Sequence, residues 1–576
     1  MADMKDIASL PVVSTPVLII GSSMVGMTLS CLLAQHGIRD CIAVEKHSST
    51  AIHPRAALFH PRTMQIYREL GLYDQMRQES AKHYDEHAGI YDVESLAGKE
   101  LKRYMEDMNE GLEHISPTSR LFLTQQMFEP LLRAQAMEKG ADLRFSTELV
   151  DFEQDDTSVT ALLQNTETGA KQVVRAQYII ACDGNRSFVR QKLGLQMQGH
   201  GLLSHSLTIY FKADLGRFVQ GKFNGVIYIN NDQVRGFFRL DKTGREGFLA
   251  VNTAGKRGTE ASRFPAKDIT HERAAEILRA AIGADVEFEI TLLSPWHAVC
   301  DVAERFRTNR ILLAGDAAHT VTPNGGFGGN TGIQDAHNLA WKLALVLQRK
   351  AGKGLIETYE AERWPVAKKT IDQVFKRYIV RTAPEFRQEG MHIEEEVPEP
   401  HLELGYQYHS RGLMATGLPG GSVTSDPATA KAGPGTMAHH VLITTATDQS
   451  GKSVEAPRPI ADLLGHSFVL VVGHEGVEWV QAARSLNEES SSALPEIGVH
   501  QLAAEGNKAF YDKYSLEPSG CVLIRPDGFV AWSEPHATAV TGDGAVGTLA
   551  PKERLKCVLQ EILCFATPRS GPSSRL

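Results

Sequence analysis

Sequence signals of disulfide-rich, zinc-binding and hydrolytic proteins are missing from this chain of 576 residues. It has no CxxC pair, no zinc-ligand spacing, no HExxH motif and no nucleophile elbow. We therefore predict no metal site and no hydrolytic chemistry, and free thiols in a reducing compartment. The seven cysteines are Cys31, Cys41, Cys182, Cys300, Cys521, Cys557 and Cys564.

Clustered positive charge and long apolar runs are missing too. The net charge is −9 with both signs spread along the chain, which argues against a nucleic-acid partner. The most apolar stretch, VLIIGSSMVGMTLSCLLA at 17–34, is interrupted by glycine and serine and follows Asp3 and Asp6. It therefore resembles neither a secretion signal nor a membrane helix, and we predict a soluble, intracellular, cytoplasmic protein without a membrane partner. The final Ser-Arg-Leu is close to the peroxisomal Ser-Lys-Leu address, which leaves the peroxisome as an alternative.

The first forty-five residues carry a dinucleotide-binding pattern. PVLIIGSSMVG predicts a strand, a tight turn and a helix, and IRDCIAVEK predicts a second strand that ends at Glu45. Gly21 makes the turn, Gly26 permits close packing of helix on strand, and the helix N-terminus faces a pyrophosphate. Glu45, 24 residues after Gly21, stands where a carboxylate meets a ribose hydroxyl. The middle position is Ser23 rather than glycine, and we expect its hydroxyl to donate to the phosphate.

A glycine-rich segment, ILLAGDAAHTVTPNGGFGGNTGIQD at 311–335, follows much later. An apolar strand ends at Asp316, a loop follows, and a helix begins near Thr331. Glycine has no Cβ, so this loop lets bare backbone approach a ligand closely.

Further segments outline the other domains. Residues 200–295 contain longer β runs, among them GVIYINNDQVRGFFRL, which predicts a hairpin. Residues 385–435 are rich in Glu, Pro, Gly and Thr and predict a linker. Residues 436–565 predict a further domain, in which the Pro-Asp-Gly of CVLIRPDGFVAW indicates a second hairpin.

Three motifs in order, GSSMVG, CDGNRSFVR and AGDAAHTVTPNGGFGGNTGIQDAHNLAWKLA, resemble those of the FAD-dependent aromatic hydroxylases. This is the para-hydroxybenzoate hydroxylase and phenol hydroxylase family of single-component flavin monooxygenases. HPRAALFHPRTMQIYRELGL is similar to the family's arginine segment, and DLLGHSFVLVVG and RPDGFVAW are similar to the thioredoxin-like domain of its phenol and polyketide branch. That domain lacks redox cysteines, as this chain does. PGTMAHHVL departs from the branch, which usually has an arginine and a proline there.

The resemblance implies an α/β fold with a Rossmann-like, glutathione-reductase-like FAD-binding domain, an inserted mixed β-sheet substrate domain and a C-terminal thioredoxin-like domain. The expected boundaries are 1–199 and 296–384 for the FAD-binding domain, 200–295 for the substrate domain, 385–435 for the linker, 436–565 for the thioredoxin-like domain and 566–576 for a disordered tail.

Residue pattern and resemblance together give the expected FAD site. By resemblance, Asp316 holds the ribityl chain and the glycine loop lies along the flavin ring edge. The next helix then aims its N-terminus at the pyrimidine end, where its dipole stabilises an anionic ring by about 0.3–1 kcal/mol. The expected cofactor-binding residues are Gly21, Ser23, Gly26, Glu45, Lys46, Arg55, Gln125, Asp183, Asp316, Pro323, Gly325, Gly326, Gly328, Gly329 and Asn330.

The reaction implied by the resemblance is a monooxygenation in secondary metabolism. NAD(P)H, with NADPH favoured, reduces FAD, and a flavin hydroperoxide then transfers oxygen from O2 to a phenolic or polyketide-type aromatic substrate. The resemblance also favours a homodimer. The catalytic base stays unidentified: Tyr228, Arg239 and His297 lie on segments that could face the substrate, and each could instead be a packed or paired residue.

Three alternatives remain open from the sequence. One is Baeyer–Villiger oxidation of a polyketide ketone on the same fold. Another is a non-catalytic flavin-binding protein. The third is a simple flavin oxidase or dehydrogenase.

Overall fold

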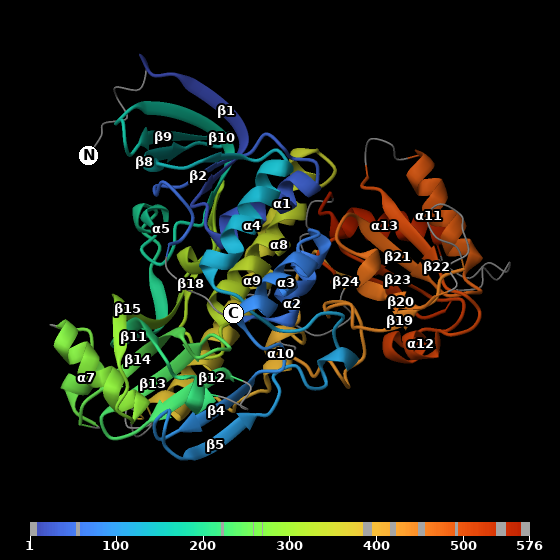
Figure 1. Ribbon diagram of the computed structural model, residues 1–576. Coiled ribbons are helices and arrows are strands. Elements are labelled where there is room, and N and C mark those ends of the chain that lie inside the picture. The colour runs from blue at the N-terminus through green and yellow to red at the C-terminus, as the bar shows by residue number, and fades with distance from the viewer. Residues whose placement is uncertain are drawn as a thin grey trace, which may run out of the picture.

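The computed structural model describes residues 9–52, 58–219, 224–256, 258–267, 269–383, 387, 394–414, 422–446, 456–489, 494–536 and 549–565. Two large sheets and a smaller C-terminal one surround a central group of helices (Figure 1). Within these ranges no helix has the length and apolarity to cross a bilayer. The same ranges contain no group of three or more His, Cys, Asp or Glu side chains arranged to hold a metal.

The first sheet has the Rossmann-like arrangement that the sequence predicts. Its parallel strands are β7 (Asp142–Arg144), β2 (Ile42–Val44), β1 (Val12–Ile20), β10 (Lys171–Ala181) and β17 (Ile311–Leu313), in that spatial order. The short β16 (Arg307–Thr308) pairs antiparallel with β17, and β8 (Thr147–Gln154) and β9 (Val159–Asn165) extend the sheet beside β10. Strands buried on both faces need continuous apolar runs, and Val17 to Ile20 are almost fully buried.

Four long helices pack together beside this sheet. They are α1 (Met24–Gln35), α4 (Gln125–Glu138), α8 (Phe327–Leu347) and α9 (Gly354–Arg377). Helix α8 contacts both α1 and α9. The glycine-rich segment, which leads into α8, therefore lies near the centre of the molecule (Figure 1). Shorter elements complete this region: β3 (Leu58–Phe59), β6 (Leu121–Phe122), α2 (Pro61–Glu69), α3 (Tyr73–His83) and α5 (Phe188–Lys192).

The second sheet is mixed and carries the expected hairpin of β12 (Asn224–Asn230) and β13 (Val234–Leu240), which is confirmed. Its strand order is β18-β15-β11-β14-β13-β12-β4-β5. The bounds of the other strands are His319–Thr320 (β18), Phe288–Ala303 (β15), Met197–Ala213 (β11), Glu246–Ala254 (β14), Gly89–Val93 (β4) and Glu100–Met105 (β5). Helix α7 (His271–Ile282) packs its apolar face on this sheet, and the short α6 (Gly216–Val219) follows β11.

The borders of the second sheet differ from the expected 200–295. Strands β4 and β5 come from the part of the chain assigned to the FAD-binding domain, and β15 continues to Ala303. β4 joins the sheet by parallel pairing with β12, far along the chain. Such pairing depends on backbone hydrogen bonds between distant segments, which no local pattern reveals.

The C-terminal sheet has the thioredoxin-like arrangement. β21 (Phe468–Val472) and β22 (Ile497–Gln501) are parallel, and β23 (Cys521–Ile524) and β24 (Val530–Glu534) form the predicted hairpin, in the order β22-β21-β23-β24. Helices α11 (Val477–Glu489), α12 (Lys508–Tyr514) and α13 (Pro551–Ile562) accompany it. A two-stranded sheet of β19 (Leu442–Ile443) and β20 (Arg458–Pro459) lies beside it (Figure 1).

The segment expected as a linker at 385–435 is packed where the structure describes it. It contains α10 (Glu399–Glu403), and Tyr406 and Tyr408 are 2% and 1% exposed. The Tyr408 ring stacks on Phe529 of the C-terminal domain with centroids 4.0 Å apart. These aromatic side chains bury the segment between domains despite its polar composition.

Candidate functional site

A cavity of about 1720 Å³ extends from the carboxyl ends of β1, β2 and β10 to the face of the second sheet. Ligands of open α/β sheets bind at this edge. The predicted residues that line it are Gly21, Ser23, Glu45, Lys46, Gln125, Asp183, Asp316, Pro323, Gly325, Gly326, Gly328, Gly329, Tyr228, Arg239 and His297. Arg55 lies outside the described residues.

The first glycine turn joins β1 to α1 and is hydrogen-bonded to the end of β2. Gly21 N–H donates to Val44 O at 2.9 Å, and Ser22 N–H donates to Glu45 Oε2 at 3.1 Å. A Cβ on Gly26 would lie 1.9 Å from Gly21 O, so only glycine fits there. The carboxylate of Glu45 thus lies directly beside the turn, at the end of β2.

Ser23 takes part in a hydrogen-bond network that sequence reasoning did not find. Its hydroxyl donates to Glu129 Oε1 at 2.5 Å, and Gln125 Nε2 donates to Ser23 Oγ at 2.7 Å. Glu129 is 1% exposed and its second oxygen accepts from Ala51 N–H at 2.7 Å. In this structure the Ser23 hydroxyl therefore donates to a carboxylate. The signal was the spacing of Gln125 and Glu129, one helical turn apart on α4.

The glycine-rich loop is shorter than the sequence indicates. Helix α8 begins at Phe327, four residues before Thr331, so Gly328, Gly329 and Asn330 form its first turn. Gly326, at φ +72°, precedes the helix in a left-handed conformation. Glycine is a poor helix former, which is why the sequence pattern assigns this turn to the loop.

Asn330 anchors the loop to a neighbouring strand. Its Oδ1 accepts from His60 N–H at 2.9 Å, and its Nδ2 donates to Leu58 O at 2.9 Å. The residue is 2% exposed. The side chain therefore positions the loop from behind, while the backbone of Gly325 and Gly326 faces the cavity.

Asp183 lies two residues after the end of β10 and stabilises the start of α5. Its Oδ2 accepts from Val189 N–H at 3.1 Å, and burial raises the pKa of the carboxyl. Among the described residues no group pairs with its Oδ1, nor with the buried hydroxyls of Ser22 and Thr320, all on residues that line the cavity.

The cavity meets the requirements of FAD at three places. Unpartnered polar atoms lie at the strand ends, the turn at Gly21 exposes bare backbone, and helices α1 and α8 begin at the cavity wall. A pyrophosphate is stabilised by a helix N-terminus, and a flat ring can lie against glycine backbone. The residues present therefore fit FAD.

The wall contributed by the second sheet is aromatic. The Tyr228 and Phe237 rings are 6.0 Å apart, and Phe248 lies 6.3 Å from Phe237 and 5.7 Å from Tyr210. Burial raises the pKa of the Tyr228 hydroxyl, and the positive charge of the nearby Arg381 opposes that shift. This part of the cavity is suited to a flat apolar body with a polar edge.

Arg239 and His297 occupy different positions on this wall. The Arg239 guanidinium carbon lies 3.6 Å from the centre of the Phe122 ring, and its Nη1 donates to Gly225 O at 2.8 Å. Burial lowers the pKa of Arg239 to about 10. His297 is exposed, with its ring 4.5 Å from that of His205. Arg239 is thus held within the wall, and His297 lies at the solvent side.

Charged residues at another part of the cavity were missed from the sequence. Arg120 Nη2 lies 2.7 Å from Glu403 Oε2, and Arg381 Nη2 lies 3.4 Å from Glu399 Oε1. Burial alone would raise the pKa of Glu399, but Arg377 and Arg381 outweigh it and lower the pKa. Both carboxylates come from α10, in the segment expected as a linker, where an acid-rich pattern gives no indication of burial.

Comparison with known proteins gives consistent matches over most of the chain. Residues 14–374 match the FAD binding domain family, and residues 431–560 match the family described as aromatic-ring hydroxylase, C-terminal. The chain is 44% identical over 532 residues to a 4-methyl-5-nitrocatechol 5-monooxygenase of Burkholderia sp, covering 91% of this chain and 94% of that relative. It is 32% identical over 542 residues to the aklavinone 12-hydroxylase RdmE of Streptomyces purpurascens, covering 92% and 98%. A crystal structure of aklavinone-11 hydroxylase with FAD and aklavinone superposes with a TM-score of 0.85 at 30% identity, covering 96% of this chain and 99% of that one.

Proposed function

This chain belongs to the FAD-dependent aromatic-ring hydroxylases and is a flavin monooxygenase, and from that premise we propose that it hydroxylates a phenolic or polyketide-type aromatic ring with NAD(P)H as electron donor. The observation that carries the proposal is the aromatic wall of Tyr228, Phe237 and Phe248, which shares one cavity with the loops that fit FAD. Bound FAD supplies the redox chemistry by which one oxygen atom of O2 reaches the substrate.

The chain's own residues orient the substrate and exclude water. A flat ring packs against the aromatic wall, and the surrounding sheet keeps bulk solvent from the reacting carbon. A phenol becomes electron-rich when its hydroxyl loses the proton, and a nearby cation favours that ionised form. Arg381, which lies near Tyr228 at the polar edge of the cavity, is the cation that we propose for this role.

The substrate class follows from the relatives. One is named for a nitrocatechol and others for aklavinone. Both names support a hydroxylated aromatic substrate for this chain. The named relatives are monooxygenases and hydroxylases, so the Baeyer–Villiger alternative draws no support from them. NADPH as the donor and a homodimer stay predictions. The peroxisomal alternative rests on a tail that lies outside the described residues.

The test is turnover by the purified, FAD-loaded chain against a panel of nitrocatechols, simple phenols and anthraquinone-type polyketides. We expect one class to stimulate NADPH oxidation and O2 uptake. With ¹⁸O2, one labelled atom should appear on an aromatic carbon of the product. Label in a ring ester would indicate Baeyer–Villiger chemistry instead. Stimulated oxidation without label in any product would contradict the proposal.

A further inference from the structure

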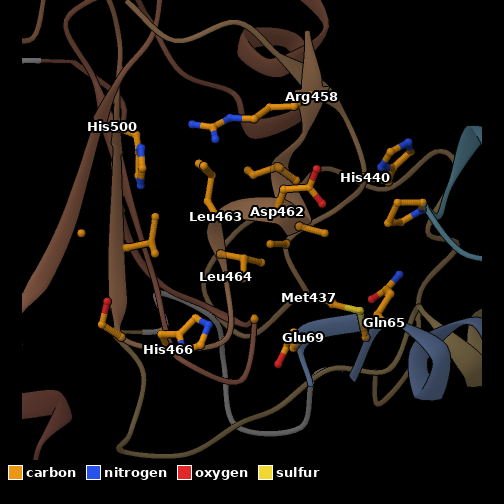
Figure 2. Close-up of a pocket in the computed structure, with 18 of the residues that line it drawn as sticks. Gln65, Glu69, Met437, His440, Arg458, Asp462, Leu463, Leu464, His466 and His500 are labelled. Carbon is orange, nitrogen blue, oxygen red and sulfur yellow. The ribbon is translucent and has the colours of Figure 1, made fainter. Parts of the chain in front are cut away.

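A second cavity, of about 1330 Å³, lies between α2 and the C-terminal domain (Figure 2). Among the described residues it shares no lining residue with the larger cavity. One side is formed by Gln65 and Glu69 of α2, and the other by β20, β22 and the turn at 460–467. None of the expected site residues lines it, so the hydroxylation reaction does not account for it.

The cavity combines an apolar surface with a few polar groups. Figure 2 shows the guanidinium of Arg458 directed toward His500, with Leu463 and Leu464 below and between them. Pockets for small organic molecules typically have this composition, in which a few polar groups fix the orientation of an apolar body.

Arg458 presents a free edge to the cavity. Among the described residues its Nε and Nη2 have no hydrogen-bond partner, although both atoms are buried. These two nitrogens form one edge of the guanidinium, and their N–H groups point in parallel. That geometry matches the two oxygens of a carboxylate, which accept both hydrogen bonds at once.

His500 is a second buried side chain in this cavity that forms no hydrogen bond with the described residues. It is 3% exposed, and neither ring nitrogen has a partner among the described residues. Burial, and then Arg458, lower its pKa to about 4, so the ring is neutral at pH 7 with one donor and one acceptor. A buried polar group without a partner is destabilising, so the presence of Arg458 and His500 in one cavity indicates a ligand.

Two of the acids in this cavity, Asp462 and Glu69, are already engaged. Asp462 Oδ1 lies 2.8 Å from Arg68 Nη2, and Glu69 Oε2 lies 2.8 Å from His337 Nε2. Within the described part of the chain no carboxylate pairs with Arg458. The Nε and Nη2 edge of Arg458 therefore offers a positive charge without an acidic partner among the described residues, which favours an anionic ligand.

We propose that this cavity binds a small organic carboxylate with an apolar body. Its carboxylate accepts hydrogen bonds from Nε and Nη2 of Arg458, and its apolar body packs on Leu463 and Leu464. His500 hydrogen-bonds a polar substituent beside the carboxylate. The two-nitrogen edge of Arg458 and an apolar floor suit such a ligand better than inorganic phosphate, which has no apolar part. This site is independent of the proposed hydroxylation.

Titration calorimetry of the FAD-loaded chain with octanoate tests the proposal. We expect saturable one-to-one binding, at least tenfold weaker binding of the neutral octanamide, and no measurable binding of inorganic phosphate. Arg458→Gln should weaken octanoate binding at least tenfold, and Arg458→Lys, which keeps the charge but loses the fork, should weaken it by a smaller factor. The control is Arg484→Gln, which changes an exposed arginine that also lines the cavity and should alter affinity less than twofold.

Four results overturn the proposal: no binding of octanoate, equal binding to Arg458→Gln, equal binding of phosphate, or competition between octanoate and the aromatic substrate with a change in the flavin absorbance spectrum. If the Arg458 variants do not fold, the proposal is tested by photolabelling the unaltered holoenzyme with a carboxylate that carries a photoreactive diazirine. Labelled peptides from 458–469 or 497–501 support the site, and labelling confined elsewhere rejects it. None of these measurements requires turnover, so their results can be interpreted even if the hydroxylation proposal fails.

Discussion

His319 and Asp335 are joined by a buried hydrogen bond of 2.7 Å between Nε2 and Oδ2, and this bond ties the turn that carries Asp316 to helix α8. Asp335 also accepts from Gly315 N–H at 3.1 Å and from Arg363 Nε at 2.7 Å. Burial alone would raise the pKa of Asp335, but His319 and Arg363 outweigh it and hold the pKa below its ordinary value. One carboxylate thus fixes the relative position of the turn, α8 and α9.

Asp335→Asn is therefore expected to weaken both fold and cofactor binding. The substitution leaves the fully buried Arg363 without its charge partner, which typically costs about 3–5 kcal/mol. Urea unfolding should show this loss, and FAD should dissociate more readily on dilution. The control is Glu357→Gln, which alters a half-exposed pair with Arg411 and should cost less than about 1 kcal/mol. Equal stability of the two variants would contradict the role of Asp335.

Gly26→Ala should displace the first turn of the FAD site. The new Cβ would lie 1.9 Å from the backbone oxygen of Gly21, which cannot rotate away. We expect a loss of about 1–3 kcal/mol in unfolding free energy and a lower FAD content after purification. Gly433→Ala is the matched control, because a Cβ there meets nothing within 4 Å. Full FAD retention by Gly26→Ala would show that the turn does not contact the cofactor.

Tyr228→Phe should affect substrate rather than cofactor. The phenol lies near Arg381, and its loss removes one polar group beside that cation at the polar edge. We expect KM for the aromatic substrate to rise about three- to tenfold, which corresponds to the loss of one polar contact, with FAD content unchanged. Tyr511→Phe, which changes a hydroxyl bonded to His474 in the C-terminal domain, should leave KM unaltered. A variant with lost FAD and unchanged KM would place Tyr228 at the cofactor instead.

Arg525→Met should loosen the C-terminal domain. Arg525 Nη1 and Nη2 donate to the two oxygens of Glu362 on α9 at 2.7 and 2.8 Å, and both residues are fully buried. Burial alone would raise the pKa of Glu362, but Arg525 and Lys342 outweigh it and lower the pKa. Removing Arg525 weakens that compensation, so we expect a cost of about 3–5 kcal/mol and faster proteolysis between the domains. The exposed pair of Arg273 with Glu276, whose side chains are 51% and 60% exposed, provides the control Arg273→Met, with little expected effect.

His500 predicts a pH dependence of stability. Its folded pKa is about 4, whereas an unfolded histidine titrates near about 6.5. Between these values the unfolded chain binds more protons, so the unfolding free energy is fully present above about pH 6.5 and falls as the pH falls toward 4. His500→Gln should reduce the loss between pH 7 and pH 5 by about 2 kcal/mol in urea titrations. His114→Gln, at a side chain that is 80% exposed, should leave the pH profile unchanged.

The motifs near Gly21 and Asp316 show which features of the fold the local sequence can predict. A strand, a glycine turn and a helix are properties of neighbouring residues, so the Rossmann-like unit and both hairpins follow from the sequence. The helix start at Phe327 was placed four residues late, because helix propensity alone cannot show that packing fixes a glycine-rich first turn.

Contacts between segments that are distant along the chain could not be predicted from the sequence. Glu129 beside Ser23, and Glu399 and Glu403 in the cavity wall, lie in stretches whose composition gives no sign that they become buried. The same holds for β4, whose partner β12 is distant along the chain.

By itself the sequence determined the type of fold, the order of the domains and most of the loops that surround the cofactor cavity, because each is encoded in short runs of residues. Only the tertiary structure decided which buried charges meet and where Arg458 and His500 come to face a common cavity. The physical reason is that burial and pairing belong to the packed molecule, in which segments hundreds of residues apart exclude water from each other.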